Sequence, residues 1–170
     1  MRFRFAAAVA GSSLLLFASA GVAQGAGGAG LTPATVCLLT RAEVEKEIGR
    51  KLSADPDGMP LAFRGAMCEY FNGTDIIYFS GPKAEANWEG MMKELNFDVS
   101  KRTPVPGLGA PAFVVYPPSR IPQQGPLATV VVKKGPHLLA VSHRVALGKP
   151  AEAALERTLA LVRIALPRLK

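Results

Sequence analysis

The chain has 170 residues, of which 49% are hydrophobic and 19% charged, and its formal net charge is +7. This composition is typical of a globular protein, and the length fits one domain with or without a processed segment, which excludes a large multidomain enzyme. With only two cysteines and two histidines, the chain cannot be a zinc-finger array, an iron–sulfur protein or a disulfide-dense miniprotein.

Residues 1–23 have the parts of a secretory signal peptide: a start with two arginines, an apolar run, and small residues at possible cleavage sites. The alternative is a membrane anchor, but the run is shorter than the roughly 20 residues that span a bilayer. We therefore expect an exported protein, periplasmic or secreted and soluble after cleavage. A flexible Gly/Ala-rich lead-in is expected over 24–35 and a single domain over 36–170.

Both cysteines, Cys37 and Cys68, fall in the expected mature part. An exported chain with two cysteines favours a disulfide between them, which would close a loop of about 30 residues. The alternative is a thiol nucleophile beside a histidine. No Cys-x-x-C motif supports a thiol–disulfide oxidoreductase.

The first predicted helix is marked at both ends. Thr40 and Glu43 have the spacing of a capping box, in which each side chain bonds the backbone N–H of the other residue. Gly49 is expected to end the helix, because glycine readily adopts the left-handed conformation there. Cys37 precedes this helix, so a disulfide would tie its start to the strand that carries Cys68.

A β-hairpin is predicted around Asn72-Gly73, a pair typical of two-residue hairpin loops. Its strands are the β-rich runs 67–71 and 74–79. With a loop of that length Cys68 lies opposite Ile77. Apolar residues on both faces of the hairpin predict a sheet that is covered on both sides.

The other elements follow from turn residues, prolines and apolar spacing. They are a turn at 55–58, a helix from Pro82, a proline-rich irregular stretch over 103–126 with a strand at 112–116, a hairpin from runs 127–133 and 137–145, and a helix from Pro150. The order α-β-β-α-β-β-β-α predicts an α+β fold, with an antiparallel sheet built from hairpins and helices packed on it.

A family resemblance is carried by four short motifs and a glycine at Gly49. The motifs are Cys37-Leu38-Leu39-Thr40, Glu43-Val44, Cys68-Glu69-Tyr70 and Gly107-Leu108-Gly109-Ala110-Pro111-Ala112-Phe113. Over about residues 36–166 the chain resembles a family of small exported bacterial proteins of unknown function, many of them lipoproteins. The resemblance implies a disulfide-closed α+β domain outside the cytoplasm and no settled activity. Ala110 stands where the family usually has an acidic residue, and the cysteine for lipid attachment is absent. These departures put an acidic role at that loop in doubt and argue against membrane tethering.

The sequence shows no catalytic or metal-binding constellation, and no cofactor is expected. His137 and His143 are six residues apart on one predicted strand. At roughly 3.3 Å per residue they lie about 20 Å apart, too far to share a metal, and each is interpreted as a hydrogen-bonded core or edge residue. The Gly107-Leu108-Gly109 motif lacks the third glycine, strand and helix of a nucleotide loop and is interpreted as a backbone turn.

Positive charge is concentrated in the second half of the chain. Residues 24–98 carry seven basic and eleven acidic side chains, whereas residues 99–170 carry eleven basic and two acidic ones. Such asymmetry can attract a polyanion or an anionic membrane surface. The candidate anion-binding residues are Lys101, Arg102, Lys133, Lys134 and Arg144. The alternative is a solvated surface on which the basic residues are dispersed.

Together these observations favour a non-enzymatic extracytoplasmic binding or interaction module. Its partner would be an extracytoplasmic protein or small ligand, or an anionic envelope polymer or membrane surface, and not nucleic acid. One alternative is an envelope-associated structural protein that docks to an anionic surface through its basic C-terminal half. Another is a small hydrolase that uses His143 or a free Cys68.

Overall fold

The computed structural model describes residues 37–61, 65–71, 73–80, 88–94, 99–118 and 123–169. Within them the elements are α2 (Arg41–Ile48), β1 (Asp57–Leu61), β2 (Gly65–Tyr70), β3 (Thr74–Ser80), α4 (Trp88–Glu94), η1 (Val99–Lys101), β4 (Thr103–Pro104), β5 (Ala112–Val115), β6 (Leu127–Lys134), β7 (His137–Arg144), α5 (Ala151–Ala165) and η2 (Leu166–Arg168). The predicted signal peptide and lead-in lie outside the described residues. No helix in the described part is long and apolar enough to cross a membrane.

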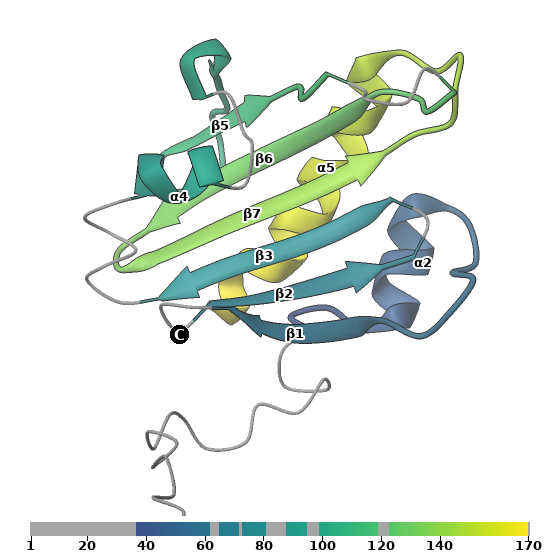
Figure 1. Cartoon of the computed structure of the whole chain (residues 1–170), viewed down its shortest axis with the longest axis horizontal. Helices are drawn as coiled ribbons and strands as arrows, with labels where there is room; N and C mark the ends of the chain where they lie inside the picture. Colours follow the sequence, from purple (N-terminus) through teal and green to yellow (C-terminus); the bar gives the residue numbers. More distant parts are fainter. Residues whose placement is uncertain are drawn as a thin grey trace, which may run out of the picture.

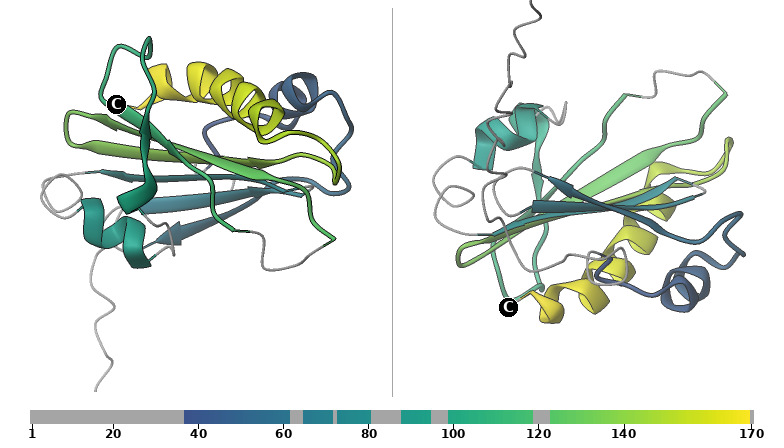
Figure 2. Two further views of the ribbon diagram at one scale, coloured as in Figure 1. Left: turned by 90° about the horizontal axis from the view of Figure 1, so that it is seen from above. Right: turned by 60° about the horizontal axis from the view of Figure 1, so that its bottom comes forward.

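The strands of the described residues form one antiparallel sheet of seven, in the order β1-β2-β3-β7-β6-β5-β4. Helices α2 and α5 cover one face, and α4 lies on the other (Figures 1 and 2). We call these the α5 face and the α4 face. The arrangement confirms the predicted α+β class, an antiparallel sheet built from hairpins with packed helices.

The start and end of α2 follow the signals in the sequence. The Thr40 side chain accepts a hydrogen bond from the backbone N–H of Glu43 at 3.3 Å, and Oε2 of Glu43 accepts one from the N–H of Thr40 at 2.8 Å. Gly49 ends the helix with φ +70°. The capping box satisfies backbone donors that the first helical turn leaves unpaired, so both predicted boundaries are confirmed.

The predicted disulfide is present between Cys37 and Cys68, whose Cα atoms are 5.2 Å apart. Close by, the hydroxyl of Tyr70 donates to the carbonyl of Leu39 at 2.6 Å and accepts from its N–H at 3.1 Å. These contacts fix the segment before α2 on strand β2. Since the described chain has no free cysteine, Cys68 is not available as a thiol nucleophile.

Apolar side chains are buried on both faces of the sheet, as predicted. On the α5 face, sheet residues Ile76, Val130, Leu139 and Val141 form one cluster with Leu161 and Val162 of α5. On the α4 face, sheet residues Ile77, Phe79, Val131, Leu138 and Ala140 form a second cluster with Met92 of α4. The predicted start of that helix, at Pro82, lies outside the described residues.

The first hairpin differs from its predicted register by one residue. Cys68 lies opposite Ile76 instead of Ile77, and Tyr70 lies opposite Thr74, which leaves three residues in the loop. Three-residue loops commonly end in a left-handed residue, and Gly73 has φ +82°. The predicted register would have placed Asp75 beside Tyr70 under the helices, where an unpaired carboxylate is costly to bury.

The outer strands also differ from the prediction. Residues 57–61 form β1 where the sequence predicts part of a turn, and Thr103–Pro104 form β4 inside the stretch predicted to be irregular. Each contains a proline, Pro60 or Pro104, which lacks a backbone N–H and is tolerated at a sheet edge. Short strands with a proline have weak alternation, so the pattern does not reveal them.

Reduction of the disulfide is expected to lower the free energy of unfolding by about 3–4 kcal/mol, because the bridge restricts a loop of about 30 residues in the unfolded chain. Urea unfolding with and without a reductant measures the loss. A variant with both Cys37→Ser and Cys68→Ala should be equally destabilised and insensitive to the reductant. Equal unfolding midpoints for the oxidised and reduced wild type would contradict this role.

Acid is expected to destabilise the protein through Glu43. Hydrogen bonds from Arg168 lower the pKa of the Glu43 carboxyl from its usual 4.5 to about 2, with further help from Thr40. Because the folded state binds this proton only at lower pH, the stabilisation is complete above pH 4.5 and is lost as the pH falls towards 2.

The variant Glu43→Gln should therefore lose about 1 kcal/mol at pH 7, a typical value for a helix cap, and should lose less on acidification than the wild type. Urea unfolding at pH 7 and below pH 4 compares the two. Glu156→Gln, on the exposed side of α5, is the control for removal of a charge. If the free energy of unfolding changed with pH in the same way for Glu43→Gln and the wild type, the ion pair between Glu43 and Arg168 would not be the source of the acid sensitivity.

Candidate functional site

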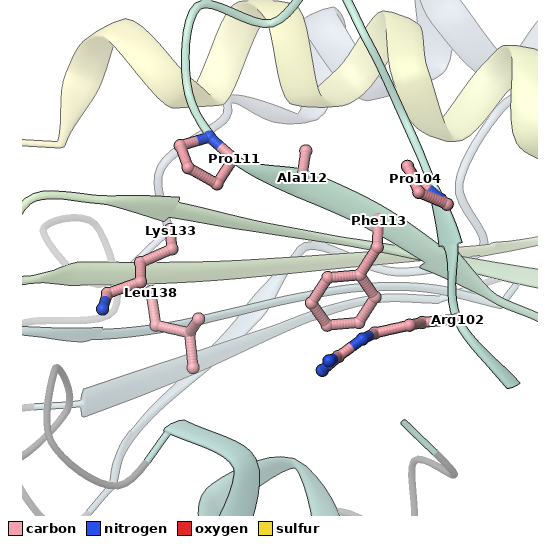
Figure 3. A pocket seen from close by; sticks show the side chains of 7 residues that line it. All are labelled: Arg102, Pro104, Pro111, Ala112, Phe113, Lys133 and Leu138. Carbon is pink, nitrogen blue, oxygen red and sulfur yellow. The ribbon is translucent and has the colours of Figure 1, made fainter. Parts of the chain in front are cut away.

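A pocket of about 230 Å³ opens on the α4 face, near the turn between β6 and β7 (Figure 3). Its lining residues come from the segment around β4 and β5 and from the two strands beside it: Arg102, Pro104, Pro111, Ala112, Phe113, Lys133 and Leu138. We call it the Phe113 pocket. Strand pairing sets Pro104 opposite Phe113 and Lys133 opposite Leu138, so residues distant in sequence meet there.

One wall of the pocket is an arginine on an aromatic ring. Cζ of Arg102 lies 5.8 Å from the ring centroid of Phe113, within the range of an attraction between a cation and the ring face. Figure 3 shows the arginine side chain running beside the ring. Nη1 of Arg102 also donates to Oε1 of Glu89 on α4 at 2.9 Å. An exposed pair of this kind contributes at most about 1 kcal/mol to stability.

The floor of the pocket is apolar, and a second cation lies across from the first. Leu138 is buried in the α4-face cluster, against which Phe113 packs. Lys133, which is half-buried, and Leu138 lie on the side of the hollow opposite Arg102 in Figure 3. Among the described residues that line the pocket there is no acidic side chain. The pocket therefore combines an apolar floor with two cationic side chains, of which Arg102 is paired with Glu89 of α4.

The rim is shaped by the connection between β4 and β5. Gly107 and Gly109 have φ values of +81° and +68°, which only glycine adopts easily, so this motif is a backbone turn, as predicted. The N–H of Val105 donates to the carbonyl of Ala112 at 2.9 Å and closes the turn. The N–H of Lys133 donates to the carbonyl of Pro111 at 2.9 Å, which holds the rim against β6.

The structure separates the five candidate anion-binding residues. Arg102 and Lys133 line the Phe113 pocket. Lys134 follows on the strand and belongs to the α5 face, where its Nζ donates to a backbone carbonyl just after α5 at 3.2 Å. Arg144 lies at the far end of β7 and donates to a backbone carbonyl before β6 at 2.8 Å. Lys101 is exposed in η1.

Sequence reasoning missed the apolar half of this pocket. Phe113 and Leu138 each look like ordinary strand residues, and alternation places Phe113 on the same face as Pro111. The signal that joins them to Lys133 is the register of β5, β6 and β7, which fixes residues on neighbouring strands opposite one another. That register depends on pairing between residues far apart in the sequence, so no local motif predicts it.

Both histidines have hydrogen-bond partners, as expected from the sequence. Nδ1 of His143 lies 2.7 Å from Oγ1 of Thr74, and Nδ1 of His137 lies 2.9 Å from Oγ of Ser80. The two rings occupy opposite ends of β7, so they do not form a shared site.

The Phe113 pocket offers contacts through which a ligand could be held. Within the described part of the chain, no three His, Cys, Asp or Glu side chains come together as a metal site requires. The described side chains that line the Phe113 pocket include no Ser, Cys, His, Asp or Glu that could act as a nucleophile or general base. Its apolar floor and flanking cations suit a small molecule with an apolar body and an anionic group.

No family model, no curated protein and no solved structure matches this chain, so the family resemblance of its motifs stays a prediction.

Proposed function

We propose that the protein is a non-enzymatic extracytoplasmic binding module whose Phe113 pocket takes a small amphiphilic anion, of the class of short-chain carboxylates. The observation that carries this proposal is the pairing of an apolar floor with Arg102 and Lys133 on opposite sides. The apolar floor would bind the hydrocarbon chain of the ligand, and the two cations would bind its anionic group. The floor alone would not distinguish the ligand from a hydrocarbon, and the cations alone would not distinguish it from a simple salt.

The energetics of the pocket favour such a ligand. An apolar chain placed on Phe113 and Leu138 gains about 25 cal/mol for each Å² removed from water. A carboxylate can take both N–H groups of a guanidinium in a pair of parallel hydrogen bonds, which are stronger than neutral ones. The cavity, about 230 Å³, is below the usual range for drug-sized ligands, so the expected ligand is short.

The proposed location outside the cytoplasm is supported by the disulfide. Disulfides persist in oxidising compartments and are rare where glutathione keeps thiols reduced. The bridge between Cys37 and Cys68 is compatible with an exported protein, as the N-terminal segment also predicts.

Hexanoate is the probe for this proposal, and hexan-1-ol is its uncharged match. In an NMR titration at constant salt, hexanoate should bind more tightly and should shift backbone signals around Phe113. Arg102→Gln and Lys133→Gln should each weaken hexanoate binding roughly five- to ten-fold and leave hexan-1-ol nearly unchanged. Phe113→Ala should weaken both ligands, because it removes the apolar contact that they share.

Two further variants sharpen this test. Glu89→Gln should tighten hexanoate binding, because it removes the carboxylate that competes for Arg102. Arg163→Gln, on the exposed side of α5, removes a positive charge far from the pocket and should have no effect. Equal affinity for hexanoate and hexan-1-ol, or shifts that avoid the Phe113 region, would refute the proposal.

The alternative of docking to an anionic envelope surface has less support. Such docking is strongest when the basic residues share one surface. Arg102 and Lys133 lie on the α4 face, whereas Lys134 and Arg168 make their contacts beside α5 and α2 on the other face. Binding of a small amphiphilic anion in the Phe113 pocket therefore remains the function that the geometry supports best.

A further inference from the structure

A second cavity, of about 280 Å³, lies on the α5 face and is lined by residues at the end of α2, the end of β7 and the start of α5. We call it the His143 cavity. Its charged and titratable lining residues are Arg50, His143, Arg144, Lys149 and Arg157. No carboxylate side chain is among the described residues that line it. The described lining is therefore cationic, with four positive side chains around one hollow.

Two of these cations are oriented by backbone contacts. Nη1 of Arg157 donates to the carbonyl of Glu47 at 2.9 Å and so satisfies one of the carbonyls left unpaired at the end of α2. This bond also offsets the negative end of the helix dipole, which would otherwise oppose an anion there. The guanidinium lies beside Gly49, where a Cβ would be 3.4 Å from Nη1 of Arg157, an ordinary contact distance. Arg144 is anchored through its bond to the carbonyl of Gly125.

The buried imidazole of His143 has one ring nitrogen left for the cavity. The side chain is 2% exposed, and its one hydrogen bond within the described chain joins Nδ1 to Thr74. Because Nδ1 is engaged by Thr74, Nε2 is the ring nitrogen that can serve the cavity that the ring lines. When the Thr74 hydroxyl donates to Nδ1, the proton of the neutral ring sits on Nε2 and can be donated into the cavity.

We propose that the His143 cavity is a binding site for a phosphate group, held by the charges of Arg50, Lys149 and Arg157 and by a hydrogen bond from Nε2 of His143. Arginine and lysine together with a neutral donor match the charge and the acceptor oxygens of a tetrahedral oxyanion. The source of the group is inorganic phosphate or a phosphomonoester, and both present the same oxygens to the site. This proposal is independent of the Phe113 pocket, which lies on the other face of the sheet.

The surroundings of His143 make it a reporter of occupancy. Burial first, and then the positive charges of Arg50 and Arg157, lower its pKa to about 4. Its opposite neighbours on the adjacent strands are Thr74 and Ala128, which do not titrate. The remaining charged groups at the cavity, Arg144 and Lys149, are also positive. A bound phosphate would reverse the sign of the nearest charge and raise the pKa of the imidazole.

The test is an NMR titration of the two histidine rings between pH 3 and pH 7 at constant ionic strength, with chloride or with inorganic phosphate. Phosphate should raise the pKa of His143 by about one unit or more. Phosphate should leave the ring signals of His137, at the other end of β7, in place, so they are the control in the same chain. An unchanged His143 in a folded protein would overturn the proposal.

Calorimetry at pH 7 and about 0.15 M salt keeps the proposal testable if the acid range unfolds the protein. Lys149→Gln, at an exposed side chain, should weaken phosphate binding roughly ten-fold, while Lys46→Gln, on the exposed side of α2, should not. Tighter binding of glycerol 3-phosphate than of inorganic phosphate assigns the site to a phosphomonoester, and the reverse order assigns it to the free anion. No binding of either compound, or equal binding by both variants, would overturn the proposal.

Discussion

The pairing of β3 with β7 is the interaction on which the rest of the structure depends. It joins the N-terminal strands β1–β3 to the C-terminal strands β4–β7, and within the described residues no other strand pair links the two groups. It runs from Thr74 opposite His143 to Ser80 opposite His137. Both buried clusters contain side chains from β3 and from β7, so this pairing fixes how the two halves of each cluster are aligned. It also holds the Thr74 hydroxyl against the His143 ring.

The parts of the fold that the sequence predicts are those that depend on neighbouring residues. Thr40, Glu43 and Gly49 mark α2 because a cap needs only residues within one helical turn. The β6–β7 hairpin follows from two long apolar runs around one tight turn. The register of the first hairpin was wrong because Asn72-Gly73 fits loops of two or three residues, and the burial of Tyr70 and the exclusion of Asp75 from the α5 face decide between them.

The candidate sites were predictable only as lists of charged residues. Arg102 and Lys133 stand out in a basic half of the chain, but their place beside Phe113 requires the register of three strands. His143 was correctly interpreted as a hydrogen-bonded core residue, although its partner, Thr74, is 69 positions away. The cavity beside it takes Arg50 from the acidic half and Arg157 from the basic half, so a division of the charge by sequence halves could not reveal it.

The prolines of the two outer strands have a consequence for the behaviour of the protein at high concentration. A strand from another molecule can add to a sheet only where the edge offers a regular row of backbone donors and acceptors. Pro60 interrupts that row on β1 and Pro104 interrupts it on β4, and β4 is only two residues long. Neither outer strand of the described sheet is therefore a good template for a second copy, which disfavours edge-to-edge association of the protein.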